Sequence, residues 1–301
     1  MLQLIACAPA LPAAAWASPS RSTASWNGVA LGADASVIVE GFSTIEAQKL
    51  IDSALTELAR LERIFSLHDN QSALTQLNQK GCLRDAPREL TEALHFSRNL
   101  FCQTNGSFDP TVQSYWLGDH LAPIGFEQVT IDKDAIQLAP GTQLTLNGIA
   151  QGFITDRIAE HFRAAGANNT LINLGEFRAT GPKSNQEAWQ IGLRDPAAVW
   201  RTSETVVLTS GALATSSSAL PSAKLAQHIF DPATGLCPTH FKSVSVVAPT
   251  AAWADGLSTA LFIMPLAKGR DLLRKQQNVA ARFTMADGQI FTTSDWARLT
   301  S

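Results

Sequence analysis

The sequence lacks a basic block, since 23 Lys and Arg stand against 26 Asp and Glu for a formal net charge of −3. Nucleic-acid binding needs clustered cationic side chains, so this composition argues against it. The 4 Cys are widely spaced and form neither a zinc pattern nor a disulfide framework. The chain also lacks a serine-protease elbow and a Cys/His metal cluster.

The first apolar stretch, residues 2–17, is too short and too broken by proline to span a membrane. It is typical of an export signal over residues 1–17, with Ala15 and Ala17 as the small residues read at cleavage. Cys7, in "LIAC", also resembles a lipoprotein processing site, which would anchor the protein to a membrane. We expect a periplasmic or exported protein; the alternative is a plain N-terminal extension.

Residues 18–28 are rich in serine and are expected to form a linker before a domain over 29–301. The segment 35–42 predicts a strand, and Ser43 with Glu46 forms a capping box that opens a helix. Further helices are expected over 90–101, from Asn147 to a stop at Gly166, over 249–264 and after Pro265.

Short strands are expected near residues 128–131, 135–138 and 142–146, with longer ones after residue 168. A hairpin is expected on Asp287 and Gly288. The predicted fold class is α+β: a single mixed domain with antiparallel sheets flanked by helices.

Asp255 and Thr259 are four residues apart in "WADGLSTALF" and therefore share one helix face. A carboxylate and a hydroxyl are hard oxygen ligands, suited to Mg²⁺ or Ca²⁺. The alternative is an acidic residue favoured by the helix dipole and a threonine bonded to its own backbone.

Gly148 and Gly152 flank the start of a predicted helix in "TLNGIAQGF". Free N–H groups there would form an anion site, and close packing is the alternative. In "NGSFDPT", Phe108 is expected to lie against a planar ligand, and the alternative is a plain turn with Phe108 in the core. In "HIFDPATG", His228 is either a general base or a structural residue before a turn.

In order and spacing, "SFDPTV", "NGIAQGFITD", "LINLG", "HIFDPATG" and "SVSVVAPTAAWADGLSTALF" resemble the ApbE family of flavin transferases. The resemblance runs from about residue 31 to 263. It implies an enzyme, an Mg²⁺-dependent transferase that moves FMN from FAD to a Thr side chain of an exported partner and releases AMP. The partner would be a redox protein with a Thr-containing acceptor domain.

The resemblance also implies residue roles. The metal would be held by Asp255, Thr259 and a backbone carbonyl near Gly148, and His228 would be the base. The implied FAD contacts are Leu31, His68, Ser107, Phe108, Asp109, Thr145, Gln151 and Ile229.

Several positions depart from the family's usual pattern. Thr145 and Gln151 stand where an acidic residue and Lys or Glu are common, and "NLGEFRATG" lacks the second glycine after Gly175. Two alternative functions therefore stay open: an FAD pyrophosphatase that uses water as acceptor, and a non-catalytic FAD-binding maturation protein.

Overall fold

The computed structural model describes residues 22–196, 198–217 and 229–300. Its helices are α1 (Thr44–Phe65), α2 (Ala73–Lys80), α3 (Arg88–Gln103), α4 (Gln113–Trp116), α5 (Ala150–Ala164), α6 (Ala251–Ile263) and α7 (Leu266–Leu273), with 3₁₀ turns η1 (Phe126–Gln128) and η2 (Trp296–Arg298). Its strands are β1 (Ser22–Ala30), β2 (Ala33–Phe42), β3 (Cys82–Arg84), β4 (Thr130–Ile131), β5 (Ala135–Gln137), β6 (Thr170–Asn173), β7 (Phe177–Ala179), β8 (Trp189–Asp195), β9 (Ala198–Leu208), β10 (Gly211–Ser217), β11 (Phe241–Ala248), β12 (Ala280–Met285) and β13 (Ile290–Thr292).

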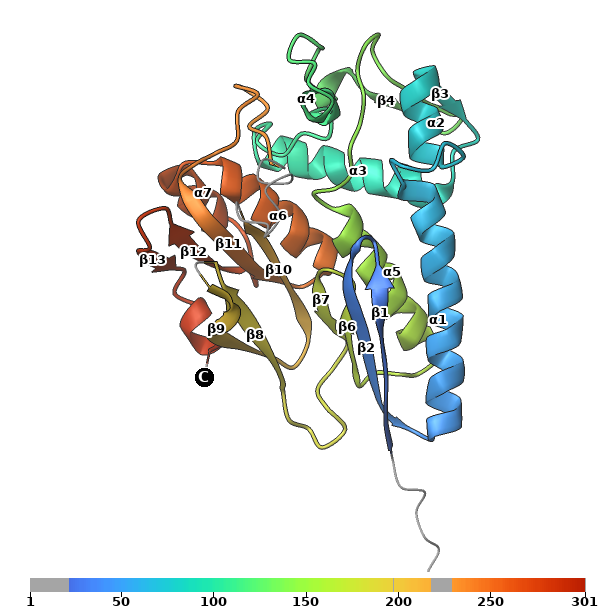
Figure 1. Ribbon diagram of the computed structural model, residues 1–301, viewed down its shortest axis with the longest axis vertical. Coiled ribbons are helices and arrows are strands. Elements are labelled where there is room, and N and C mark those ends of the chain that lie inside the picture. The colour runs from blue at the N-terminus through green and yellow to red at the C-terminus, as the bar shows by residue number, and fades with distance from the viewer. Residues whose placement is uncertain (1–21, 197, 218–228, 301) are drawn as a thin grey trace, which may run out of the picture.

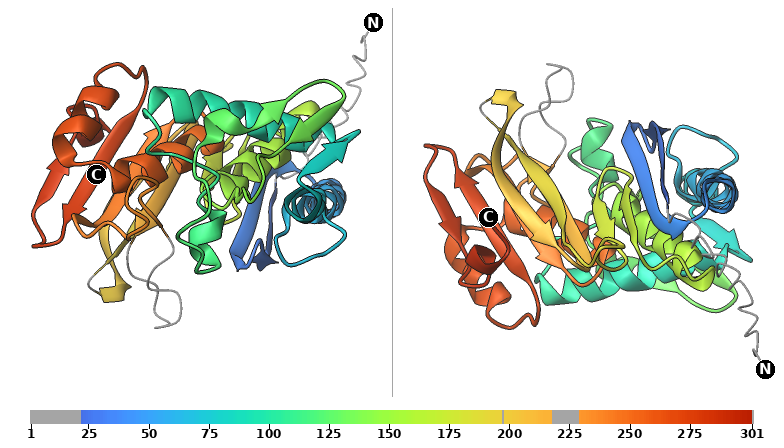
Figure 2. Two further views of the ribbon diagram at one scale, coloured as in Figure 1. Left: turned by 90° about the horizontal axis from the view of Figure 1, so that it is seen from above. Right: turned by 90° about the horizontal axis from the view of Figure 1, so that it is seen from below.

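An eight-stranded antiparallel sheet in the order β1-β2-β6-β7-β10-β11-β12-β13 organises the domain (Figure 1). Helices cover one face, and the β8–β9 hairpin lies against the other (Figure 2). The predicted α+β fold, a single mixed domain with antiparallel sheets, is confirmed. Within the described ranges, every helix is too short or too polar to cross a bilayer.

Helix starts follow local capping chemistry in two of the predicted cases. The Ser43 hydroxyl accepts from Glu46 N at 3.3 Å, and the Glu46 carboxylate accepts from Ser43 N at 3.1 Å. Thr250 caps α6 by accepting from Trp253 N at 3.3 Å. The predicted cap at Asn147 is wrong: α5 starts after Ile149, and Asn147 N instead donates to Thr145 Oγ1.

The predicted linker over 18–28 is wrong for residues 22–28, which belong to β1 and pair with β2. Side-chain burial alternates along residues 23–30, but the inward face carries mainly small residues such as Ala24, Gly28 and Ala30. The hydropathy pattern is therefore weak although the strand geometry is regular. Residues 18–21 lie outside the described ranges.

The strand predicted over 142–146 is also wrong, because only Gln143 forms an isolated bridge, with Val112. The Asn78 side chain satisfies the neighbouring backbone, accepting from Leu144 N and donating to Leu144 O, each at 2.8 Å. A side chain thus takes the place of a partner strand here.

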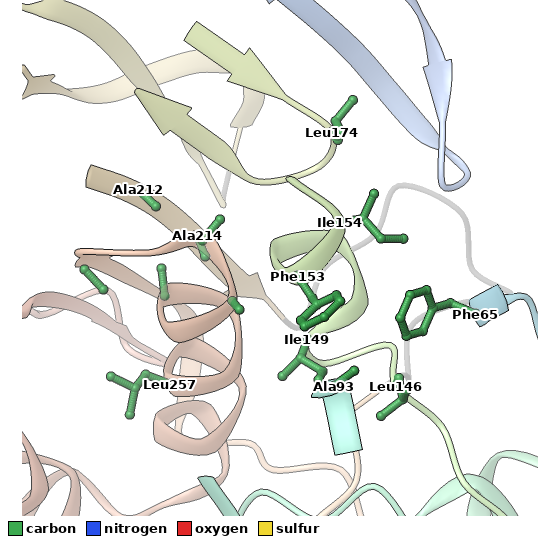
Figure 3. Close-up of a cluster of buried hydrophobic side chains, with 14 of the residues drawn as sticks. Phe65, Ala93, Leu146, Ile149, Phe153, Ile154, Leu174, Ala212, Ala214 and Leu257 are labelled. Carbon is green, nitrogen blue, oxygen red and sulfur yellow. The ribbon is translucent and has the colours of Figure 1, made fainter. Parts of the chain in front are cut away.

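The sheet separates two apolar clusters. In β10, Ala212 and Ala214 face the helices, whereas Leu213 faces the β8–β9 hairpin. Helix α6 is apolar around almost its whole circumference and is buried between the sheet and the helices α3 and α5. Figure 3 shows the larger cluster, where the rings of Phe65 and Phe153 meet edge to face at 5.6 Å.

Candidate functional site

A cavity of about 830 Å³ opens beside this core. The turn between β1 and β2, the end of α1, the loop 107–112, the start of α5, the turn between β6 and β7, the end of β10 and one side of α6 all line it. Its size falls in the range of about 300–1,000 Å³ common for small-molecule and cofactor sites.

All predicted site residues within the described ranges line this one cavity. They are Leu31, His68, Ser107, Phe108, Asp109, Thr145, Gly148, Gln151, Ile229, Asp255 and Thr259. His228 lies outside the described residues. Positions scattered over more than two hundred residues of sequence therefore meet at one place.

The predicted metal positions lie next to one another. Asp255 and Thr259 are one turn apart on α6, on the side that lines the cavity. A Cβ placed on Gly148 would lie 3.2 Å from Thr259 Oγ1 and 3.1 Å from the Phe108 ring, so the Gly148 backbone approaches both closely. Carboxylate, hydroxyl and carbonyl oxygens together form a donor set that fits Mg²⁺ or Ca²⁺.

The helices α5 and α6 exchange hydrogen bonds at this point. Gly152 N on α5 donates to Asp255 Oδ2 at 3.0 Å. In return, Asp156 on α5 accepts from Ala251 N at 2.9 Å and Ala252 N at 2.8 Å at the start of α6. The Gly152 N–H is thus bonded to Asp255 and is not free for an external anion, so at Gly152 the structure favours the alternative interpretation, close packing.

Close packing at Gly152 leaves no room for a side chain. A Cβ there would lie 2.3 Å from the carbonyl oxygen of Ala251. Behind this contact, Arg178 on β7 forms a buried ion pair with Asp156, with Nε 3.1 Å from Oδ1. The sheet, α5 and α6 are therefore fixed relative to one another beside Asp255.

The cavity is rich in acidic side chains. Among its described lining residues are the acids Glu62, Asp109, Glu176 and Asp255, and none is Lys or Arg. Burial, reinforced by the negative charge of Asp156, raises the pKa of Asp255 from its ordinary 3.8 to about 7, although the Gly152 N–H opposes this shift. Burial and the charge of Asp255 raise the pKa of Glu176 well above its ordinary value.

The described residues hold no group of three or more His, Cys, Asp and Glu side chains able to bind a metal. A cation in this cavity would therefore depend on carboxylate, hydroxyl and carbonyl oxygens acting together. This donor set disfavours Zn²⁺, which prefers nitrogen and sulfur.

The loop 107–112 is organised by Asp109. Its Oδ1 accepts from Thr111 N at 2.8 Å and Thr111 Oγ1 at 2.7 Å, and its Oδ2 accepts from Phe126 N at 3.3 Å. Burial raises the pKa of this carboxyl. Asp109 holds the loop so that the Phe108 ring lies against Gly148, in both the core and the cavity wall.

Two further predicted positions are held by hydrogen bonds to other segments of the chain. Leu31 has a left-handed φ of 52°, and its N–H donates to Glu62 Oε1 at 2.7 Å. Thr145 is buried, and its N–H donates to the carbonyl oxygen of Pro110 at 2.8 Å. His68 is exposed at the cavity rim.

The turn after Ile229 agrees with the sequence interpretation. Asp231 accepts from Ala233 N at 2.9 Å through its side chain and from Gly235 N at 2.8 Å through its carbonyl. Gly235 takes a left-handed φ of 67°, as a turn of this kind requires.

Sequence reasoning missed Glu62, Glu176, Trp116 and Phe230, which also line the cavity. Phe230 packs against Tyr115 and Trp116, with ring centroids 6.0 Å apart in both cases. For Phe230, proximity to Ile229 offered a signal; for Trp116 and Glu62 the sequence offered none.

Comparisons with known proteins agree on one family. The sequence model of the ApbE family matches residues 31–283. The FAD:protein FMN transferase of Haemophilus influenzae is 26% identical over 297 residues, 86% of this chain and 85% of the relative. The enzyme of the same name from Treponema pallidum is 29% identical over 295 residues, 81% of this chain and 79% of the relative.

Solved structures share the fold. The ApbE protein of Thermotoga maritima superposes with a TM-score of 0.83 at 23% identity, over 93% of this chain and 100% of the other. The flavin transferase ApbE of Vibrio cholerae gives 0.79 at 21% identity, over 93% and 99%.

Proposed function

Because this chain belongs to the ApbE family, we propose that it is an FAD:protein FMN transferase that uses Mg²⁺ and joins FMN to a Thr side chain of a partner protein. The observation that carries the proposal is the convergence of the described family positions on one cavity of about 830 Å³. The cavity presents acids and neither Lys nor Arg among its described lining residues, so a bound cation would offset the repulsion between these acids and the anionic dinucleotide.

The reaction would proceed by displacement at phosphorus. The Thr oxygen forms a bond to the phosphorus on the FMN side of the FAD diphosphate, and the bond from that phosphorus to the AMP oxygen breaks. AMP leaves with the electron pair, and the hydroxyl proton passes to His228. A divalent cation, when bound, neutralises charge on the diphosphate and on the departing AMP.

The chain's own residues have separable tasks in this proposal. Asp255, Thr259 and the Gly148 carbonyl hold the cation. Phe108, held by Asp109, forms an apolar wall against which the flavin or adenine ring lies. The contacts between α5 and α6 keep Asp255 fixed before substrate binds, which reduces the reorganisation needed in the transition state.

We also propose that the protein acts outside the cytoplasm after cleavage behind Ala17. The first described strand begins at Ser22, so this cleavage leaves every described element intact. The acceptor would then be an exported redox protein with an accessible Thr. Intact mass of the periplasmic protein tests the cleavage site and distinguishes it from lipidation at Cys7.

The activity is tested by incubation with FAD, Mg²⁺ and a Thr-containing acceptor domain. Flavin fluorescence that stays with the denatured acceptor supports the transferase. AMP and free FMN without labelling identify a pyrophosphatase, and bound FAD without AMP identifies a binding protein. An acceptor with the Thr replaced by Ala is the matched control.

A further inference from the structure

A second buried carboxylate faces the cavity beside Asp255. Glu176 lies in the turn between β6 and β7 and is 7% exposed, and Asp255 on α6 is 5% exposed. Both line the same cavity, and Glu176 accepts from the N–H of Thr215 on β10, whose neighbour Ser216 has its Oγ 3.4 Å from Thr259 Oγ1. Two buried acids 79 positions apart in the sequence thus line one cavity, and we call them the acidic pair.

The turn that carries Glu176 is tightly held. Leu174 N donates to Glu176 O at 3.3 Å, and Gly175 N donates to Asn173 Oδ1 at 3.2 Å. Gly175 has a left-handed φ of 103°, and a Cβ there would lie 2.5 Å from Gln151 Nε2. The turn therefore rests on Gln151, and Glu176 is placed by packing.

No basic side chain compensates this pair in the described part of the chain. The lining residues include neither Lys nor Arg, and Arg178, two residues after Glu176, pairs with Asp156. Backbone N–H groups supply the only neutralisation seen: Gly152 N–H on Asp255 and Thr215 N–H on Glu176. Burying both groups in their charged form without a cation is strongly unfavourable, and either protonation or a bound cation relieves this cost.

We propose that Glu176 is an additional ligand of the divalent cation, with Asp255, Thr259 Oγ1 and the Gly148 carbonyl. Mg²⁺ and Ca²⁺ take six or more oxygen ligands, so the set implied by the family resemblance leaves positions to be filled. The inference rests on the proposed function only for the presence of a cation in this cavity. A second carboxylate predicts that the protein binds the cation even without FAD.

The test is Mn²⁺ binding to the whole mature protein in the absence of FAD, measured by titration calorimetry. Wild type should bind Mn²⁺, and Glu176→Gln and Asp255→Asn should each weaken binding by about 10–100-fold. Glu62→Gln is the matched control: it removes a carboxylate from the same cavity that is already bonded to Leu31 N, and affinity should stay within about twofold.

A second readout is the melting temperature. Mn²⁺ should raise that of wild type, and the increase should be much smaller for Glu176→Gln. Since Gln has nearly the shape of Glu and carries no charge to bury, the metal-free variant should melt no lower than wild type.

The outcomes separate this inference from the proposed function. If Glu176→Gln binds Mn²⁺ like wild type while Asp255→Asn does not, Glu176 is not a ligand and the family site stands. If both variants bind like wild type, the cation lies elsewhere. Glu176 is then not a ligand, and the proposed metal site at Asp255 is also wrong. Equal weakening by Glu62→Gln, or no binding to wild type without FAD, would also overturn the assignment of Glu176.

Discussion

Asp255 on α6 accepts a hydrogen bond from the backbone N–H of Gly152 on α5 at 3.0 Å. The first N–H groups of α6 donate in return to the Asp156 carboxylate on α5. Each helix therefore provides a carboxylate that accepts from N–H groups at the start of the other. Helix starts leave N–H groups without intrahelical partners, and here carboxylates of the neighbouring helix accept from them. The proposed cation ligand is therefore part of the contact that holds the two helices together.

Gly152→Ala should disrupt this contact. The new Cβ would meet the Ala251 carbonyl oxygen at 2.3 Å, which forces the helices apart. We expect a loss of about 1–3 kcal/mol in unfolding free energy, and weaker FAD and Mn²⁺ binding. Urea denaturation and binding titrations measure both effects.

Gly192→Ala is the control for this prediction. Its Cβ would lie 3.1 Å from a methyl of Thr202 in the β8–β9 hairpin, across the sheet from the cavity. Ligand binding should be unchanged in this variant. Wild-type binding in a folded Gly152→Ala protein would show that the helix contact does not position the site.

The metal-free protein should become less stable as pH rises through the range from about 4 to 7. The folded-state pKa of Asp255 is raised from 3.8 to about 7, so in this window the folded state binds more protons than the unfolded state. Stability then falls by up to about 1.4 kcal/mol per pH unit for this one group. Glu176 shifts in the same direction.

Asp255→Asn should reduce the slope of unfolding free energy against pH by the contribution of about one proton. Urea denaturation of both proteins at several pH values in EDTA gives the comparison. Mn²⁺ should reverse the trend, because the cation binds the deprotonated carboxylate and its affinity rises with pH. Parallel pH profiles for the two metal-free proteins would contradict the assignment of this shift to Asp255.

These contacts also indicate what the sequence could and could not predict. Ser43 and Thr250 cap their helices through neighbours three residues away, so local pattern was sufficient. The shared face of Asp255 and Thr259 follows from the helical period. The inward face of β1 consists mainly of Ala and Gly, and its weak hydropathy signal led to the wrong linker over residues 22–28.

Long-range placement was not accessible in the same way. Glu176 and Asp255 line the same cavity because β6, β7 and β10 are neighbours in the sheet and α6 packs on β10, a placement with no local signal. The Gly152 N–H donates to Asp255 on another helix. The local sequence does not reveal this acceptor, so we expected the N–H to be available to an anion. The strand predicted over 142–146 failed because the Asn78 side chain satisfies that backbone.

Chelation with EDTA should abolish FMN transfer, and Mg²⁺ should restore it. Zn²⁺ should restore activity poorly, because Asp255, Thr259, Glu176 and the Gly148 carbonyl offer only oxygen. Initial rates of acceptor labelling in metal-depleted buffer with each added ion provide the measurement. Full activity in the presence of EDTA would rule out a cation in the reaction.

His228→Ala should slow transfer by about 10²–10⁴-fold while the KM for FAD stays nearly unchanged, since a base acts mainly in the transition state. Asp255→Asn should instead lower Mg²⁺ affinity, so that raised Mg²⁺ restores part of the rate. His240→Ala, an exposed histidine of the same segment, is the control and should be fully active. A stable, fully active His228→Ala protein would remove His228 from the mechanism.

The most direct test of the central claim is the ratio of AMP released to flavin bound covalently to the acceptor in a single turnover. The account predicts one AMP for each flavin, with the flavin located on a Thr by peptide mass spectrometry. It further predicts that both products are absent when that Thr is Ala. AMP released without any bound flavin would contradict the transferase and identify water as the acceptor.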